Sequence, residues 1–216
     1  MRHVAALALA VATACGEPPA RRAPADTGGV ARPVRVRGTL RSRDSALFVV
    51  ACGTTVERAV TATPASQLEE ALVAVTGALR DSMYAELMAD TTGARLVARE
   101  TLFASSLGEG SRCDRPRYPY DFEAFGNEPF WHVTVDGAQL VLERPERPLE
   151  LAFVADPPVT RGALTTIIAR RDEGRVRELK IGLLRDACRD GMSDAWYPYR
   201  AEVRFGTTAL HGCARR

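Results

Sequence analysis

The pattern of apolar and polar residues in the first half of the chain predicts a small β structure with one helix. Stretches that alternate or run continuously apolar are typical of strands, and they occupy residues 34–40, 46–51, 56–61, 83–88 and 96–103. Between the third and fourth stretches, apolar residues recur at helical spacing at Leu68, Leu72, Val75 and Leu79. Residues 66–69 before them have the form of a capping box. Three strands, a helix and two further strands predict a five-stranded barrel of the OB type.

The second half of the chain shows strand patterns alone. They cover residues 132–135, 139–142, 149–154, 164–170, 176–183, 199–205 and 208–212. Asp136-Gly137 separates the first two and favours a tight hairpin turn. About seven strands joined mainly by hairpins indicate a small antiparallel β-barrel or sandwich. The expected fold class is therefore all-β, with one helix in the first domain and an OB-like barrel followed by this second β domain.

The first residues have a different composition from the rest. Residues 1–3 form a short, positively charged segment, residues 4–11 are apolar, and small residues at 12–14 precede Cys15. This is the form of a bacterial lipoprotein signal, and its apolar run is far shorter than the roughly 20 residues that cross a bilayer as a helix. We predict that Cys15 carries lipid, since two or more acyl chains anchor a protein stably. An ordinary secretory peptide cleaved near Ala14 is the alternative.

The same patterns predict the organisation of the chain. A signal peptide with its lipobox cysteine covers residues 1–15, and a flexible linker rich in Pro, Gly and Ala covers residues 16–33. An OB-like domain follows over residues 34–114, and a C-terminal β domain covers residues 120–214. Gly16 follows the cysteine, and the resemblance to bacterial lipoproteins, together with the absence of Asp at this position, implies sorting to the outer membrane.

With Cys15 assigned to lipid, an even set of four cysteines remains: Cys52, Cys113, Cys188 and Cys213. An exported chain passes through an oxidising compartment where cysteines pair, and three pairings are possible. Pairing the first two and the last two keeps each bond inside one predicted domain, so we expect these disulfides. The chain has no CxxC motif and therefore signals neither a thioredoxin-like pair nor a zinc knuckle. We expect no metal and no cofactor.

Composition narrows the function classes. The chain has 216 residues, of which 46% are hydrophobic, enough for a packed core. Its 29 basic residues are nearly balanced by 27 acidic ones. A protein that neutralises nucleic-acid phosphates needs a concentrated positive face. Nucleic acid is therefore not an expected partner.

Part of the first half resembles a known family. The matching features are Phe48, Cys52-Gly53, the strand at 56–60, the helix, the run 83–87 and Cys113. Over about residues 34–114 they resemble the C-terminal OB-fold domain of the NlpE lipoproteins. That resemblance implies an outer-membrane lipoprotein concerned with surface sensing, envelope stress and copper homeostasis. The family's other domain, a lipocalin-like barrel with a CxxC motif, is absent here, so copper binding and redox sensing are not carried over.

Three sequence signatures mark the second half. They are GNEPFW at 126–131, C-x-DGMSD-x-x-YP at 188–198 and GCA at 212–214. In this order they resemble an uncharacterised family of bacterial envelope proteins, often lipoproteins, over about residues 120–214. The resemblance implies a β domain that faces the periplasm, without implying a reaction.

The signatures also contain the candidate ligand-binding residues. These are Asn127, Glu128, Trp131, Asp190, Ser193, Asp194 and Tyr197. Three of them are carboxylates that could converge on a cation or a sugar, while the aromatic rings, with Trp196, could supply stacking faces. The alternative is structural: two ordered loops in which Gly, Asn, Asp and Ser satisfy turn geometry, held by the disulfide between Cys188 and Cys213.

Catalytic templates are missing from the sequence. There is no G-x-S-x-G elbow, no HExxH helix and no phosphate-binding glycine loop, and we interpret His132, in an alternating strand, as a packed or surface histidine. The leading hypothesis is a membrane-anchored, non-enzymatic envelope module that binds a ligand or senses envelope stress. A second is an inhibitor or carbohydrate-binding module acting on cell-wall hydrolases or peptidoglycan, and a third is a hydrolase using Glu128, Asp190 and Asp194. The expected partners are the membrane, through the lipid anchor, and periplasmic proteins or peptidoglycan.

Overall fold

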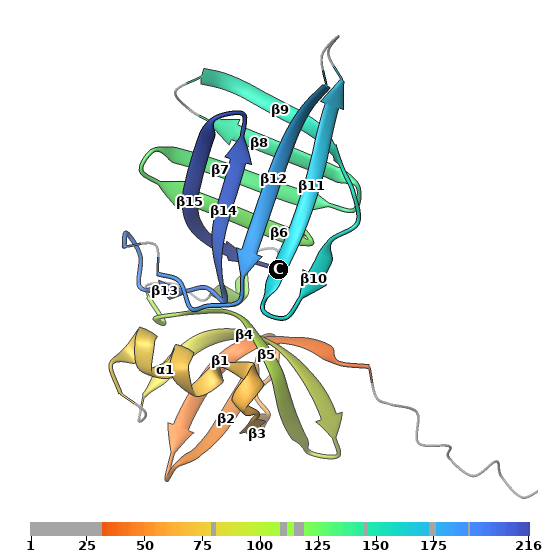
Figure 1. Cartoon of the computed structure of the whole chain (residues 1–216). Helices are drawn as coiled ribbons and strands as arrows, with labels where there is room; N and C mark the ends of the chain where they lie inside the picture. Colours follow the sequence, from red (N-terminus) through yellow and green to blue (C-terminus); the bar gives the residue numbers. More distant parts are fainter. Residues whose placement is uncertain are drawn as a thin grey trace, which may run out of the picture. The chain divides into compact units, whose positions relative to one another are not determined.

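The computed structural model describes residues 32–78, 81–108, 112–114, 119–144, 147–172, 176–189 and 191–216 (Figure 1). The chain divides into two units, residues 1–30 and 31–216. Cys15, the predicted signal peptide and nearly all of the predicted linker lie outside the described residues. The described residues of the second unit are mostly in strands and include a single α-helix, which confirms the predicted all-β class.

The first barrel has five strands and the helix in the predicted order. Its elements are β1 (Val34–Arg43), β2 (Ala46–Ala51), β3 (Glu57–Ala62), the 3-10 turn η1 (Pro64–Ser66), α1 (Leu68–Thr76), β4 (Ser82–Thr92) and β5 (Arg95–Ser105). β1 pairs with both β2 and β4, β2 pairs with β3, and β5 pairs with β4 and, in parallel, with β3. The sheet therefore closes on itself, as the OB-like order predicts.

Helix α1 buries the apolar face that the sequence predicts, with Leu68, Ala71 and Leu72 inside the barrel core. The predicted capping box is wrong. Gln67 is the N-cap residue in a left-handed conformation, with no side-chain cap bond. Ser66 belongs to the preceding 3-10 turn, where its hydroxyl donates to the carbonyl of Thr63 and accepts a hydrogen bond of 3.4 Å from the Leu68 N–H. The helix ends at Thr76, so its predicted apolar residue at 79 lies outside the described residues.

The second barrel is built from strands that follow one another around a closed sheet (Figure 1). Its elements are β6 (Phe122–Asn127), β7 (Phe130–Asp136), β8 (Gln139–Arg144), β9 (Arg147–Ala155), β10 (Val159–Arg161), β11 (Leu164–Asp172), β12 (Val176–Leu184), β14 (Tyr199–Phe205) and β15 (Thr208–Arg215). Eight of these strands form an antiparallel barrel, in which β9 pairs with β11 and the last strand, β15, pairs with the first, β6. The short strand β10 pairs with β11. The structure therefore contains the barrel rather than the sandwich.

One short strand of the C-terminal half belongs to the first sheet. β13 (Ala195–Trp196) pairs with Ser105 and Ala104 of β5. Trp196 is 1% exposed and lies in the hydrophobic core of the first barrel. Residues 31–216 form one compact unit, so the division into domains at 34–114 and 120–214 stays a prediction.

Both predicted disulfides are present. Cys52 is bonded to Cys113, which lies in the short 3-10 turn η2 (Arg112–Asp114), and Cys188 is bonded to Cys213 of β15. This pairing confirms the prediction and fits an oxidising, extracytoplasmic compartment. Among the described residues, no helix has the length and apolar character to span a membrane.

Candidate functional site

The first and third signatures meet in the wall of the second barrel. GNEPFW forms the β6–β7 hairpin, in which Gly126 lies opposite Trp131. The Trp131 ring is fully buried, and its Nε1–H donates to the carbonyl of His211 at 3.3 Å. A Cβ on Gly126 would lie 2.3 Å from Trp131 Nε1, and one on Gly212 would lie 1.8 Å from the carbonyl of Phe125. These glycines are therefore required by close packing between the signatures.

The second signature joins the same packing. Cys188 and Tyr197 exchange two backbone hydrogen bonds, of 2.9 and 3.0 Å. The Tyr197 ring is 8% exposed and contacts Phe125 in β6 and Phe103 in β5, with centroids 4.9 and 5.4 Å apart. The cysteines of both disulfides pack against this aromatic cluster. The geometry of these loops is thus explained by packing alone.

The predicted ligand-binding residues have different environments. Trp131 and Tyr197, like Trp196, are buried, so they present no broad ring face for stacking. Asn127 is half-buried. Glu128 is exposed in the turn of the β6–β7 hairpin, whereas Ser193 and Asp194 are exposed in the bend before β13. Ser193 Oγ accepts a hydrogen bond from the backbone of Ala195.

Asp190 lies outside the described residues, and a convergence of the three predicted carboxylates stays a prediction. Nowhere in the described part of the chain do three His, Cys, Asp or Glu residues lie close enough together to hold a metal ion.

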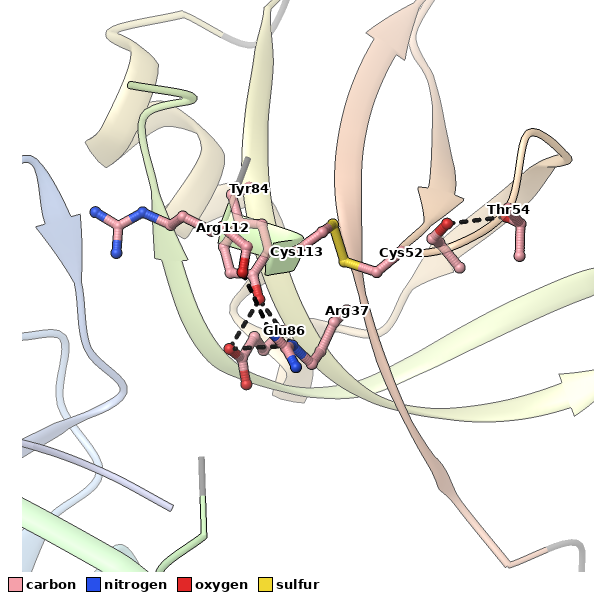
Figure 2. The surroundings of a disulfide bond; sticks show 8 residues. Arg37, Cys52, Thr54, Tyr84, Glu86, Arg112 and Cys113 are labelled. Carbon is pink, nitrogen blue, oxygen red and sulfur yellow. Dashed lines mark hydrogen bonds and ion pairs between the residues drawn. A yellow bond between two sulfur atoms is a disulfide. The ribbon is translucent and has the colours of Figure 1, made fainter. Parts of the chain in front are cut away.

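Buried carboxylates occur where the sequence analysis did not place them. Glu86 is 5% exposed beside the Cys52–Cys113 disulfide. Arg35 donates to its Oε2 at 2.8 Å, and the Tyr84 hydroxyl donates to its Oε1 at 2.9 Å. Figure 2 shows Arg37 beside Tyr84 and Glu86. Arg37 donates from Nε to the Tyr84 hydroxyl oxygen and from Nη2 to the carbonyl of Arg112. Burial raises the pKa of Tyr84. The donors compensate a buried negative charge, as folding requires.

A second buried carboxylate, Glu100, links elements of the two barrels. Glu100 of β5 is 4% exposed and accepts hydrogen bonds from the Tyr199 hydroxyl of β14, at 2.8 Å, and from Arg216. Burial, followed by the charge of Glu100, raises the pKa of Tyr199 to about 12. Arg185 lies 4.0 Å from the same carboxylate and also donates to the carbonyl of Ala65. This network fixes contacts within the compact unit rather than offering an open reactive site.

His132 on the second barrel contacts two carboxylates, which its position in an alternating strand does not predict. His132 Nε2 lies 2.8 Å from Glu123 Oε1, and Nδ1 lies 3.6 Å from Glu143 Oε2. The hydrogen bond to Glu123 raises the pKa of His132, against its own burial. Burial raises the pKa of Glu123, but the contacts with His132 and Arg215 outweigh it and leave that pKa lowered. The arrangement favours a protonated imidazole that is ion-paired with Glu123.

A hollow lies on the outer surface of the second barrel. It has a volume of about 540 Å³ and is lined by Leu164, Thr166, Lys180, Gly182, Leu184, Arg200, Ala201, Glu202, Arg204 and His211. These residues come from β11, β12, β14 and β15, which are neighbours in the sheet. The volume is within the range of about 300–1,000 Å³ typical of small-molecule sites.

The strand register explains the hollow. Side chains of a strand alternate between faces, so the outer surface of β12 carries Lys180, Gly182 and Leu184 at successive outward positions. Gly182 stands between Thr166 of β11 and Glu202 of β14. Because it has no side chain, the outer surface is open at the centre of this row.

Gly182 differs from every other glycine that the structure describes. Each of the others either has a positive φ or has no room for a Cβ. At Gly182 the φ is ordinary, and a Cβ would meet only Leu164 Cδ1, at 3.7 Å, and the Glu202 carbonyl, at 4.0 Å. A glycine inside a strand costs stability and often marks a close approach by a ligand. Neither the backbone φ nor the space around a Cβ requires a glycine at this position. Sequence analysis did not single it out, although a glycine inside a predicted strand was the signal that could have found it.

The comparisons with known proteins supply no further assignment: no protein-family model, curated protein or solved structure matches this chain.

Proposed function

We propose that the chain is a membrane-anchored, non-enzymatic binding module of the cell envelope, and that its ligand occupies the hollow around Gly182. The observation that carries the binding function is the glycine itself. It opens a hollow of about 540 Å³ in a strand where backbone geometry and packing would accept a side chain.

The location rests on different features. The lipoprotein signal ending at Cys15 supplies the anchor, and both sequence resemblances point to the bacterial envelope. The two disulfides support an oxidising compartment. A binding or sensing module in the envelope agrees with the signal, the resemblances and the disulfides.

The anchor is tested by metabolic labelling. Labelled palmitate should enter the wild-type chain and be absent from the Cys15→Ser variant. Equal labelling of the two chains would contradict the anchor and leave the binding site untouched.

The binding site is tested by native mass spectrometry of the protein recovered from bacterial envelopes. We expect the wild-type chain to retain a bound small molecule and Gly182→Val to lose it, because the new side chain fills the centre of the hollow. Ala152→Val is the matched control, since Ala152 is an exposed strand residue of β9 outside the lining. A wild-type chain with no adduct, or a Gly182→Val chain that keeps it, would contradict the proposed site.

A second candidate function rests on the exposure of Glu128 and Asp194 in the signature loops. If these carboxylates bind peptidoglycan, the double substitution to Ala should abolish retention on insoluble peptidoglycan without lowering the melting temperature. A parallel loss of stability would show that the residues are structural.

A further inference from the structure

The hollow around Gly182 has a cationic end and an apolar end. The strand register sets Lys180 opposite Arg204 and Leu184 opposite Arg200. The charge of Arg200 is already paired with Asp186, at 2.6 Å. Leu164 is in turn paired with Leu184, and each of these leucines is 43% exposed. Lys180 and Leu184 are four residues apart, so the two ends are separated by about 13 Å at a rise of about 3.3 Å per residue.

The cationic end is arranged at a cost to the fold. Like charges directly opposite each other on neighbouring strands are destabilising, and Lys180 faces Arg204 in this way. Arg204 is paired with Glu202, whereas Lys180 makes no ion pair with any residue that the structure describes. The Arg204 hydrogen bond, and after it the charges of Arg204, His211 and Lys180, lower the pKa of Glu202.

Lys180 is also the only lysine in the chain, in which all the other 28 basic residues are arginine. An ammonium group differs from a guanidinium in being a compact point charge with three rotatable donors. It suits a head group whose oxygen atoms approach from several directions.

We infer that the ligand is a single-chain amphiphile with an anionic head group, bound with its head at Lys180 and Arg204 and its alkyl chain over Gly182 toward Leu164 and Leu184. This assignment rests on the proposed function and adds the chemistry of the ligand. The open strip at Gly182 lets the chain lie against the backbone. The two exposed leucines lose water on contact, which is favourable at about 25 cal/mol per Å² of buried apolar area. The head group supplies the carboxylate or phosphate partner that Lys180 lacks, since Arg204 is already paired with Glu202.

Lys180 provides a single-site probe of this binding. Reductive methylation with ¹³C-formaldehyde retains its charge and gives one side-chain NMR signal, with the N-terminal amine of the full chain carrying Cys15→Ser as an internal reference. The signal is followed during titration with decanoate and, separately, decyl phosphate. Acetate and inorganic phosphate test the head without the chain, and decyl maltoside tests the chain without the charge.

We expect decanoate and decyl phosphate to shift the Lys180 signal saturably, with the N-terminal signal unchanged. Decyl maltoside, which lacks the charge, should bind at least about tenfold more weakly, the effect of losing one charge-assisted contact. Acetate and inorganic phosphate should also bind at least about tenfold more weakly, because they lack the alkyl chain whose burial is favourable. Gly182→Val should abolish the saturable shift and Ala152→Val should preserve it.

The outcomes separate this inference from the proposed function. If an envelope-derived adduct depends on Gly182 but neither decyl anion binds, the site stands and the ligand class is wrong. Inorganic phosphate that binds as tightly as decyl phosphate would also overturn the amphiphile. A decanoate shift that persists in Gly182→Val would place the ligand outside the hollow and contradict both.

Discussion

Replacing Trp196 should destabilise the first barrel, although this residue is encoded in the half of the chain that forms the second. Its side chain is 1% exposed and lies among the core residues of the first barrel, next to β5. Truncation of a fully buried tryptophan to alanine removes its apolar burial and leaves a cavity. The expected loss is about 3–5 kcal/mol in the free energy of unfolding.

A comparison with Trp131 isolates the contribution of the indole nitrogen. Both rings are buried, but Trp131 Nε1 donates to the His211 carbonyl, whereas Trp196 Nε1 has no hydrogen-bond partner among the described residues. Phenylalanine keeps most of the apolar ring at either position. Trp131→Phe additionally removes the donor to the His211 carbonyl, at a cost of about 1–3 kcal/mol. We therefore expect Trp196→Phe to be the milder of the two substitutions.

Urea denaturation followed by far-ultraviolet circular dichroism measures both effects, and hydrogen exchange with mass spectrometry locates them. Trp196→Ala should lower the protection of β4 and β5, the first-barrel strands, as well as its own segment. The reasoning is refuted if Trp196→Ala weakens only strands of the second barrel, or if Trp196→Phe costs more than Trp131→Phe.

Two other predictions concern the disulfide and the histidine of the second barrel. Replacing Cys188 and Cys213 together by Ala opens a loop of 25 residues and should cost about 3.5 kcal/mol by chain entropy, measured by urea denaturation; an unchanged midpoint would contradict this. The hydrogen bond to Glu123 raises the pKa of His132, so its contribution to stability is complete below the ordinary value of 6.5 and is lost as pH rises through the raised value. His132→Gln should therefore be more destabilising at about pH 5.5 than at about pH 8.5, and a deficit independent of pH would argue against the ion pair.

The fold was largely predictable because its strands are local patterns. Alternation identified most of the strands, and the position of the helix between the third and fourth strands indicated the OB order. Closure of the second barrel depends on Cys213 pairing with Phe125 across the sheet, a contact between distant residues that no local pattern encodes. The insertion of Trp196 into the first core has the same cause.

The candidate site was less predictable, because aromatic and acidic residues in a loop have the same sequence appearance whether they bind or pack. Burial of Trp131 and Tyr197 depends on contacts with β15 and β5 that only the folded chain reveals. The hollow arises from Gly182 and side chains on four strands. Its one local signal was a glycine two residues after the only lysine.

The central claim is that Gly182 is present for a ligand rather than for the fold, and thermal unfolding with and without decanoate tests it most directly. Without ligand, Gly182→Val should be more stable than wild type by about 0.5–1 kcal/mol, since a strand favours a β-branched residue over glycine and the structure has room for a Cβ. Decanoate should raise the melting temperature of the wild-type chain and leave that of Gly182→Val unchanged. A Gly182→Val chain that is less stable than wild type and still gains stability from decanoate would contradict the account.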